Sequence, residues 1–208
     1  MARYTDSVCK ICRRDGEKLY LKGERCFTDK CAVTRRPYRA GEHGRERRKV
    51  TEYGMRLAEK QKVRMVYGVM EKQFQKYFEM ADRKKGVTGE NLIKTLESRL
   101  DNVIYRLGFA LSRNEARQLV QHGHVLVNGR KTSIPSHLVS PGDVIELKDK
   151  IKGNTRLKEI REITSEHQAP SWLEVDPERM RGTVLDEPVR DEIDIPIREQ
   201  YIVEYYSR

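Results

Sequence analysis

Residues 112–131, SRNEARQLVQHGHVLVNGRK, constrain the fold of this chain more than any other segment. Ser112 and Glu115 have capping-box spacing, in which each side chain satisfies a free backbone N–H at the start of a helix. Gly123 can adopt the left-handed conformation that ends a helix. A short apolar run then leads into Asn128-Gly129, the strongest short signal for a β-hairpin. The segment predicts a capped helix followed by an antiparallel hairpin.

Cationic side chains recur along this helix and hairpin. Because residues four apart share a helix face, Arg113, Arg117 and Gln121 lie together, opposite the apolar residues Leu119 and Val120. Arginine suits RNA, because its planar fork binds phosphate through two hydrogen bonds and can stack on a base. We therefore interpret the segment as an RNA-binding surface, with service of Asn128 to the turn alone as the alternative for that residue. Its predicted contacts are Arg113, Arg117, Gln121, His124, Asn128, Arg130 and Lys131.

The segments on either side extend this unit. The apolar residues of 96–107 fall on one helical face and Gly108 ends the run, which predicts a single helix there. Arg99 and Arg106, two turns apart, share a side of that helix and are further candidate RNA contacts. After the hairpin, Ser140–Asp143 reads as a turn and Val144–Leu147 as a strand.

Residues 99–145, RLDNVIYRLGFALSRNEARQLVQHGHVLVNGRKTSIPSHLVSPGDVI, resemble the S-four RNA-binding domain, a module that binds structured RNA in several protein classes. Other segments resemble the bacterial small-subunit ribosomal protein S-four family, so the resemblance covers nearly the whole chain. They are MARYTDSVCKICRR, RRPYRAGEHG, YGMRLAEKQKVRMVYGVMEKQFQKYF, PSWLEVD and the closing QYIVEYYSR.

The resemblance implies an α+β protein with four parts. Residues 1–45 form a zinc-binding arm with an arginine-rich loop, and 46–97 form a helical domain. Residues 98–161 form the S-four RNA-binding domain, with two helices and a small antiparallel sheet. Residues 162–208 are an acidic carboxy-terminal extension that packs back on the helical domain and completes it.

The charge of the chain is large and unevenly distributed. The net charge is +10 and the pI is about 9.5. Residues 1–161 carry 37 Lys+Arg and 20 Asp+Glu, whereas 162–208 carry 5 and 12. Such a balance implies an acidic partner such as nucleic acid. The alternative is that surplus cations merely solubilise the protein, but their clustering favours a binding surface. A membrane is not expected, because the chain has no long apolar run.

The densest cationic cluster lies in residues 35–49. Pro37, Gly41 and Gly44 discourage regular structure there, so water or phosphate must solvate the guanidinium groups. The alternative is a flexible loop without a partner; we expect RNA contact, with Tyr38 adding base stacking. The candidate contacts of the arm and loop are Arg13, Arg14, Arg35, Arg36, Arg39, Arg47, Arg48 and Lys49.

All four cysteines, Cys9, Cys12, Cys26 and Cys31, lie in the first 31 residues, as C-x2-C and C-x4-C pairs thirteen residues apart. Four thiolates make a closed, structural zinc site. Two disulfides and four unrelated thiols are the alternatives, but no secretory segment precedes the cluster, and a reducing cytosol favours metal. An iron–sulfur cluster is the minor alternative. In the resembled family some members carry these cysteines and bind metal, and others lack them.

We do not expect an enzyme. A closed Cys₄ site leaves no coordination position for substrate, and the sequence shows no nucleotide-binding or hydrolase motif.

The resemblance implies a cytoplasmic constituent of the small ribosomal subunit that binds its ribosomal RNA, nucleates assembly of the subunit body and contributes to translational accuracy. The implied neighbours are proteins S-five and S-twelve, and messenger RNA where it enters the subunit. The alternatives are a translational repressor of its own messenger RNA and an accessory subunit of an RNA-modifying enzyme. No small-molecule substrate is expected.

Overall fold

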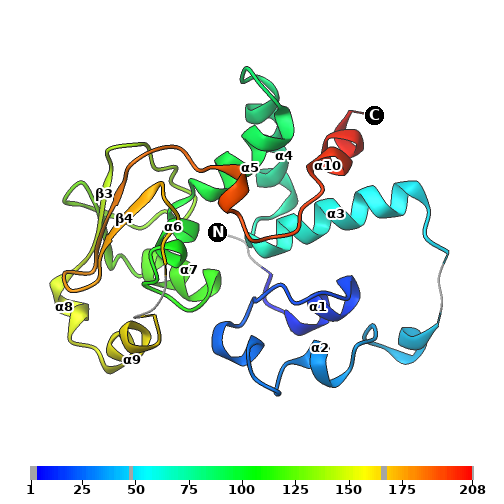
Figure 1. Ribbon diagram of the computed structural model, residues 1–208, viewed down its shortest axis with the longest axis horizontal. Helices are drawn as coiled ribbons and strands as arrows, with labels where there is room; N and C mark the ends of the chain where they lie inside the picture. Colours follow the sequence, from blue (N-terminus) through cyan, green and yellow to red (C-terminus); the bar gives the residue numbers. More distant parts are fainter. Residues whose placement is uncertain (1–3, 47–48, 165–167, 208) are drawn as a thin grey trace. The chain divides into compact units, whose positions relative to one another are not determined.

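The computed structural model describes residues 4–46, 49–164 and 168–207 of the chain (Figure 1). The predicted α+β class is confirmed, with helices and one small antiparallel sheet. The chain divides into two compact units, 1–92 with 195–208, and 93–194. The candidate contacts Arg47 and Arg48 lie outside the described residues. Within the described ranges, no helix is both long and apolar enough to cross a membrane.

The first unit is helical. α10, near the carboxyl end of the chain, packs against α3, so segments far apart in the sequence build this unit. Gly68, at φ +62°, ends the turn that separates α3 from α4. Gly89 of α5 lies so close to Glu199 of α10 that an added Cβ would come within 2.7 Å of the glutamate Cβ. The elements are α1 (Cys9–Asp15), η1 (Gly23–Cys26), α2 (Ala32–Arg35), η2 (Glu42–Arg45), α3 (Glu52–Val66), α4 (Glu71–Asp82), the start of α5 (Thr88–Glu97) and α10 (Glu199–Tyr206).

A polar network fastens α10 to α3 and α4. The buried Lys60 ammonium lies 2.6 Å from Glu71 Oε1, and the Tyr206 hydroxyl donates to the same oxygen at 2.9 Å. The Tyr206 ring stacks on Phe78, with ring centroids 4.6 Å apart. Burial and the Glu71 carboxylate raise the pKa of Tyr206. Burial alone would raise the pKa of Glu71, but its bonds to Lys60 and Tyr206 outweigh that effect and lower it.

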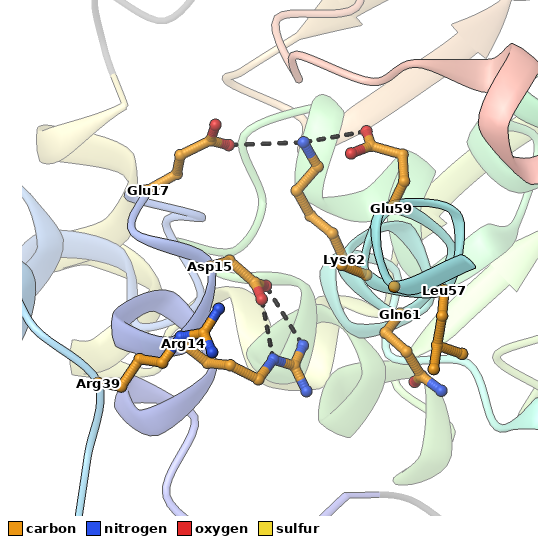
Figure 2. A pocket seen from close by; sticks show the side chains of 10 residues that line it. Arg14, Asp15, Glu17, Arg39, Leu57, Glu59, Gln61 and Lys62 are labelled. Atoms are coloured by element: carbon orange, nitrogen blue, oxygen red, sulfur yellow. Dashed lines mark hydrogen bonds and ion pairs between the residues drawn. The ribbon is translucent and has the colours of Figure 1, made fainter. Parts of the chain in front are cut away.

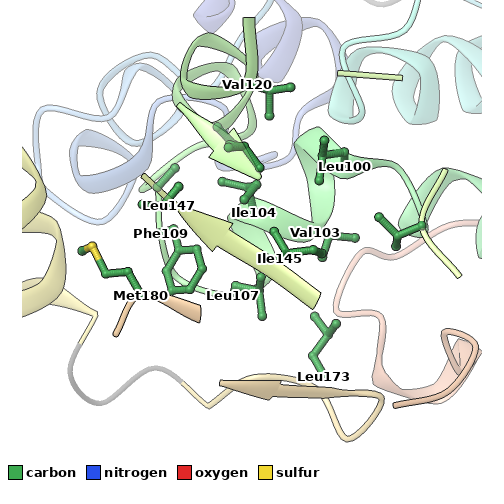
Figure 3. Close-up of a cluster of buried hydrophobic side chains, with 14 of the residues drawn as sticks. Leu100, Val103, Ile104, Leu107, Phe109, Val120, Ile145, Leu147, Leu173 and Met180 are labelled. Atoms are coloured by element: carbon green, nitrogen blue, oxygen red, sulfur yellow. The ribbon is translucent and has the colours of Figure 1, made fainter. Parts of the chain in front are cut away.

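The second unit is a five-stranded antiparallel sheet with helices, in the strand order β2-β1-β3-β5-β4. Its core joins α6, α7 and the sheet through fully buried residues such as Ile104, Val120 and Ile145 (Figure 3). Gly182 of β5 faces Leu107, whose side chain occupies the space that a Cβ would need. The elements are α6 (Leu100–Arg106), α7 (Arg113–Gln121), β1 (Val125–Val127), β2 (Arg130–Thr132), β3 (Val144–Leu147), α8 (Asp149–Lys152), α9 (Thr155–Ile163), β4 (Leu173–Asp176), β5 (Arg181–Val184) and η3 (Arg190–Glu192), together with the end of α5.

The predicted capped helix and hairpin are confirmed. The Ser112 side chain accepts the Glu115 N–H at 3.2 Å, while Glu115 Oε2 accepts the Leu111 N–H at 3.0 Å. Asn128 and Gly129 both have positive φ, +50° and +75°, as a two-residue hairpin turn of the mirror-image type requires.

The single helix predicted over residues 96–107 is wrong. α5 ends at Glu97 and α6 begins at Leu100, because Arg99 between them is extended, at φ −71° and ψ 137°. Arg99 forms an antiparallel bridge with Leu138, and the Val139 N–H donates to the Ser98 carbonyl at 2.9 Å. Pairing with a distant segment thus overrides a helical periodicity that is correct on either side.

The predicted acidic extension 162–208 is divided in the structure. Its strands β4 and β5 join the sheet through β3, and only residues 195–208 belong to the helical unit. The sheet unit therefore continues beyond the predicted boundary at residue 161. Trp172, the only tryptophan, is 2% exposed within the core of this sheet unit.

Candidate nucleic-acid interface

Four of the predicted RNA-binding arginines are held inside the sheet unit by two buried acidic residues. Arg106 donates from Nε and Nη2 to the two oxygens of Glu97, at 2.9 and 3.0 Å. Arg99 binds both oxygens of Asp101, at 3.0 and 2.6 Å. Arg117 donates to Asp101 Oδ2 at 3.3 Å.

The fourth arginine, Arg113, joins the same network through Asn102. Its Nε donates to Asn102 Oδ1 at 2.7 Å, and its guanidinium lies 4.6 Å from the centre of the Tyr105 ring. The Asn102 amide donates in turn to Glu97 Oε2 at 2.7 Å. RNA contact by Arg99, Arg106, Arg113 and Arg117 stays a prediction, and their engagement in the interior argues against it. The sequence signal for this network is Glu97 and Asp101, four residues apart in an apolar stretch, since buried carboxylates require partners.

A second group of cationic and imidazole side chains in the sheet unit is exposed or half-buried. The imidazole of His124 lies in the field of His122, Lys131, Lys148 and Lys150, and burial together with these charges lowers its pKa. His124 is therefore mainly neutral at pH 7, and the lysines supply the positive charge. Lys148 follows β3 and donates its N–H to the His124 carbonyl at 2.9 Å.

Lys148 and Lys150 were missed in the sequence. Antiparallel pairing of β1 with β3 brings the end of β3 beside the start of β1, which is the signal that identifies them. A pocket of about 280 Å³ lies nearby, lined by residues of α7 and α9 and by both histidines.

The other predicted contacts on the hairpin differ in exposure and engagement. Arg130 and Lys131 are exposed, and Gln121 is half-buried. Asn128 is occupied, because its Oδ1 accepts the Val144 N–H and its Nδ2 donates to Asp143 Oδ1, both at 2.8 Å. Asn128 thus fastens the hairpin turn to β3.

The arginine-rich loop of the helical unit is folded around Tyr38. The guanidinium groups of Arg13 and Arg45 lie 5.1 and 4.6 Å from the Tyr38 ring centre. Arg13 also donates to the Tyr38 and Arg39 carbonyls, at 2.8 and 3.1 Å. The predicted base stacking by Tyr38 must therefore compete with these two arginines. A hydrogen bond from Arg45 and the charges of Arg45, Arg36 and Arg13 lower the pKa of the tyrosine.

Close backbone packing fixes this loop. A Cβ on Gly44 would lie 2.0 Å from the Arg39 carbonyl oxygen, so only glycine fits there.

The exposed residues Arg35, Arg36, Arg39 and Lys49 form no ion pair within the described part of the chain. Arg35 donates to the Asp29 carbonyl at 3.2 Å. These side chains are available to phosphate, whereas Arg13 has a structural role in holding the loop.

A pocket of about 350 Å³ in the helical unit lies between this arm and α3 (Figure 2). Arg14 is engaged by Asp15, with an Nε to Oδ1 distance of 2.8 Å. Lys62 reaches Glu59 at 3.0 Å and Glu17 at 3.5 Å, and donates to the Pro196 carbonyl at 2.7 Å. Three carboxylates thus offset the cations that line this pocket, which distinguishes it from the exposed loop beside it.

The four cysteines come from α1, η1 and the residue that precedes α2. Backbone groups hydrogen-bond the sulfurs of Cys12, Cys26 and Cys31, and the Lys22 N–H donates to Cys26 Sγ at 3.4 Å. Burial raises the pKa of Cys12 and Cys26. Burial also acts on Cys31, but hydrogen bonds from Thr34 and Val33 outweigh it and lower its pKa. Among the described residues, no three His, Cys, Asp or Glu side chains are gathered closely enough to hold a metal ion. Four cysteine thiolates are nonetheless the donor set typical of a structural zinc site.

Comparisons with known proteins agree with this architecture. The family model "Ribosomal protein S4/S9 N-terminal domain" matches residues 3–97, and the model "S4 domain" matches residues 98–145. The chain is 60% identical to "Small ribosomal subunit protein uS4" of Halothermothrix orenii and 58% identical to that of Pelotomaculum thermopropionicum. It is 59% identical to "Small ribosomal subunit protein uS4A" of Symbiobacterium thermophilum. All three alignments cover 100% of both chains. The chain therefore belongs to the small ribosomal subunit protein uS4 family.

Proposed function

We propose that this protein is a structural constituent of the small ribosomal subunit that binds ribosomal RNA directly. The observation that carries the proposal is full-length similarity to uS4 proteins, together with exposed cations on both units. Phosphate contacts dominate the affinity of such a protein, and RNA shape supplies selectivity. The contact set that fits the structure best is Arg35, Arg36, Arg39, Lys49, Arg130, Lys131, Lys148 and Lys150.

The finer roles are part of the same proposal and rest on family membership. The protein nucleates assembly of the subunit body and contributes to translational accuracy. It lies beside proteins S-five and S-twelve, near messenger RNA where it enters the subunit. Its role is non-enzymatic, and it acts in the cytoplasm as part of the ribosome.

The RNA interface is tested by removing charge at the candidate contacts. In filter binding to small-subunit ribosomal RNA across a salt series, Arg36→Ala with Arg39→Ala should weaken binding and reduce the salt slope. The expected reduction is about 0.7–0.9 for each phosphate that the variant no longer neutralises. Lys131→Ala with Lys148→Ala should act similarly in the sheet unit.

The matched control is Lys72→Ala with Lys76→Ala, which removes two exposed charges on one face of α4. Its affinity and slope should remain near those of the unaltered protein. Equal weakening by all three double variants, or equal affinity of the protein for an unrelated structured RNA, would indicate a generic polycation and contradict the proposal.

Zinc belongs to the proposal as a structural ion held by Cys9, Cys12, Cys26 and Cys31. It would join α1, η1 and the start of α2, which present the arginine-rich loop. The support is a donor set of four cysteines, three of which also have backbone hydrogen bonds at their sulfurs. Elemental analysis should give one zinc per chain. Removal by a chelator should change hydrogen exchange in residues 4–46 while leaving Trp172 fluorescence unchanged, because Trp172 lies in the other unit. Iron and acid-labile sulfide in place of zinc would support the alternative cluster.

A further inference from the structure

Two aromatic rings of the amino-terminal arm are stacked together at the surface. The Tyr20 and Phe27 ring centroids are 4.9 Å apart, at an interplanar angle of 31°. Phe27 is 75% exposed and Tyr20 is 42% exposed. Single exposed apolar residues are ordinary, but a packed aromatic pair this open to water marks a contact surface.

The backbone holds Tyr20 in this position at a conformational cost. Leu19 and Leu21 on either side are buried, at 6% and 9% exposure, so the chain is anchored inward at both neighbours. Tyr20 between them has φ +50°, in the left-handed region that residues with a side chain rarely adopt. Local strain of this kind persists where the surroundings enforce it, and it is concentrated at functional sites.

Two arginines are anchored to the turn that follows Phe27. Arg25 Nε donates to the Lys30 carbonyl at 3.3 Å, and Arg35 Nε donates to the Asp29 carbonyl at 3.2 Å. Both residues are exposed, and neither forms an ion pair with another residue in the described part of the chain. The turn that follows Phe27 thus holds two cationic groups, one from η1 and one from α2.

We propose that Tyr20 and Phe27 form a stacking platform for an unpaired RNA base whose flanking phosphates are bound by Arg25 and Arg35. This inference rests on the proposed function and adds a specific site to it. The faces of unpaired bases stack on aromatic rings, and nearby arginines neutralise the flanking phosphates. A protein partner would also bury the rings, but the cations beside them favour a polyanion.

The test replaces Phe27 in the full chain, where the exposed ring should tolerate substitution without loss of the fold. Phe27→Ala should weaken binding to small-subunit ribosomal RNA roughly 5- to 150-fold, the equivalent of about 1–3 kcal/mol for one stacked base. Because no charge is removed, the salt slope should stay unchanged. Phe27→Leu should weaken binding nearly as much, since leucine keeps the apolar area but has no π-face. Phe27→Trp keeps an aromatic face, so it should bind with the affinity of the unaltered protein.

Val87→Ala is the matched control, since it removes another exposed apolar side chain, 62% exposed, from the same unit. It should leave the affinity unchanged. Wild-type affinity in Phe27→Leu would overturn the inference in favour of a simple apolar contact, and wild-type affinity in Phe27→Ala would eliminate the site. In both cases the unaltered protein still binds, so the proposed function survives. Failure of the unaltered protein to prefer ribosomal RNA would overturn both.

Phe27→Trp also supplies a direct readout. Trp172 is buried, so the new indole should dominate the solvent-accessible emission. Stacking should quench this emission when a short single-stranded ribosomal RNA fragment is added. Unchanged emission at saturating RNA would contradict the platform.

Discussion

At the scale of residues, the cationic side chains of the sheet unit include some that are buried against a carboxylate and others that are exposed to solvent. Arg99 is 2% exposed and Arg106 is 8% exposed, each with two charge-assisted bonds to one carboxylate. The side chains of Arg130 and Lys131, by contrast, extend into solvent. In a buried pair, removal of one partner leaves an uncompensated charge, whereas an exposed cation can be removed at little cost.

Arg106→Ala should therefore destabilise the sheet unit and leave the RNA surface unchanged. Glu97 is 0% exposed, so the truncation would leave its carboxylate without its bidentate partner. We expect a loss of about 3–5 kcal/mol in the free energy of unfolding. Urea denaturation followed by Trp172 fluorescence measures it, because the only tryptophan lies in the core of the same unit.

The control for this variant is Arg179→Ala. The Arg179 side chain is 76% exposed and lies 3.7 Å from Asp176, so its loss should leave the urea midpoint unchanged. A normal urea midpoint for Arg106→Ala, combined with weaker RNA binding, would show instead that Arg106 serves the interface.

At the scale of elements, α10 depends on the hydroxyl of its last residue. Tyr206→Phe keeps the ring on Phe78 but removes the 2.9 Å bond to Glu71. We expect the helical unit to lose about 1.5–3 kcal/mol, as is typical of a hydrogen bond to a charged group. Thermal unfolding followed by circular dichroism measures the change. Tyr205→Phe, in the neighbouring residue, is the control and should be nearly neutral.

The same substitution should alter the pH dependence of stability at both the alkaline and the acid end of the pH range. The pKa of Tyr206 is raised in the folded protein, so stability declines as pH rises above about 10, where only the unfolded chain loses that proton. Tyr206→Phe should flatten this alkaline decline. The pKa of Glu71 is lowered, so its contribution is lost as pH falls below its ordinary value of 4.5. Without the tyrosine donor the pKa of Glu71 is lowered less, so the loss of stability on the acid side should be smaller. Unchanged profiles at both ends would contradict the network.

The elements that the sequence predicts correctly are those specified locally. Ser112, Gly123 and the Asn128-Gly129 pair determine a cap, a helix end and a turn within a few residues, and the structure contains all three. The break at Arg99 and the entry of β4 and β5 into the sheet depend on partners about 40 residues distant, at Leu138 and in β3. The role of an arginine depends on the same long-range contacts, so the candidate interface is less predictable than the fold.

At the scale of the molecule, the net charge resides in the helical unit. Residues 93–194 carry 16 Lys+Arg and 17 Asp+Glu, net −1, so the remainder carries 26 and 15, net +11. Several cations of the sheet unit are also neutralised internally, Arg99, Arg106 and Arg117 among them. We therefore expect the helical unit to provide most of the attraction to RNA, and the sheet unit a local group around Lys131 and Lys148.

This distribution predicts how the two units share RNA binding. A fragment of residues 93–194 contains a complete core, so it should fold alone and show cooperative unfolding by Trp172 fluorescence. Its binding to small-subunit ribosomal RNA should have a much smaller salt slope than that of the full chain, because each neutralised phosphate contributes about 0.7–0.9 to the slope. Adding Lys131→Ala and Lys148→Ala to the fragment should remove most of the remaining slope. A folded fragment that retains the full slope would place the electrostatic interface in the sheet unit, and would contradict the assignment of Arg36 and Arg39 as principal contacts.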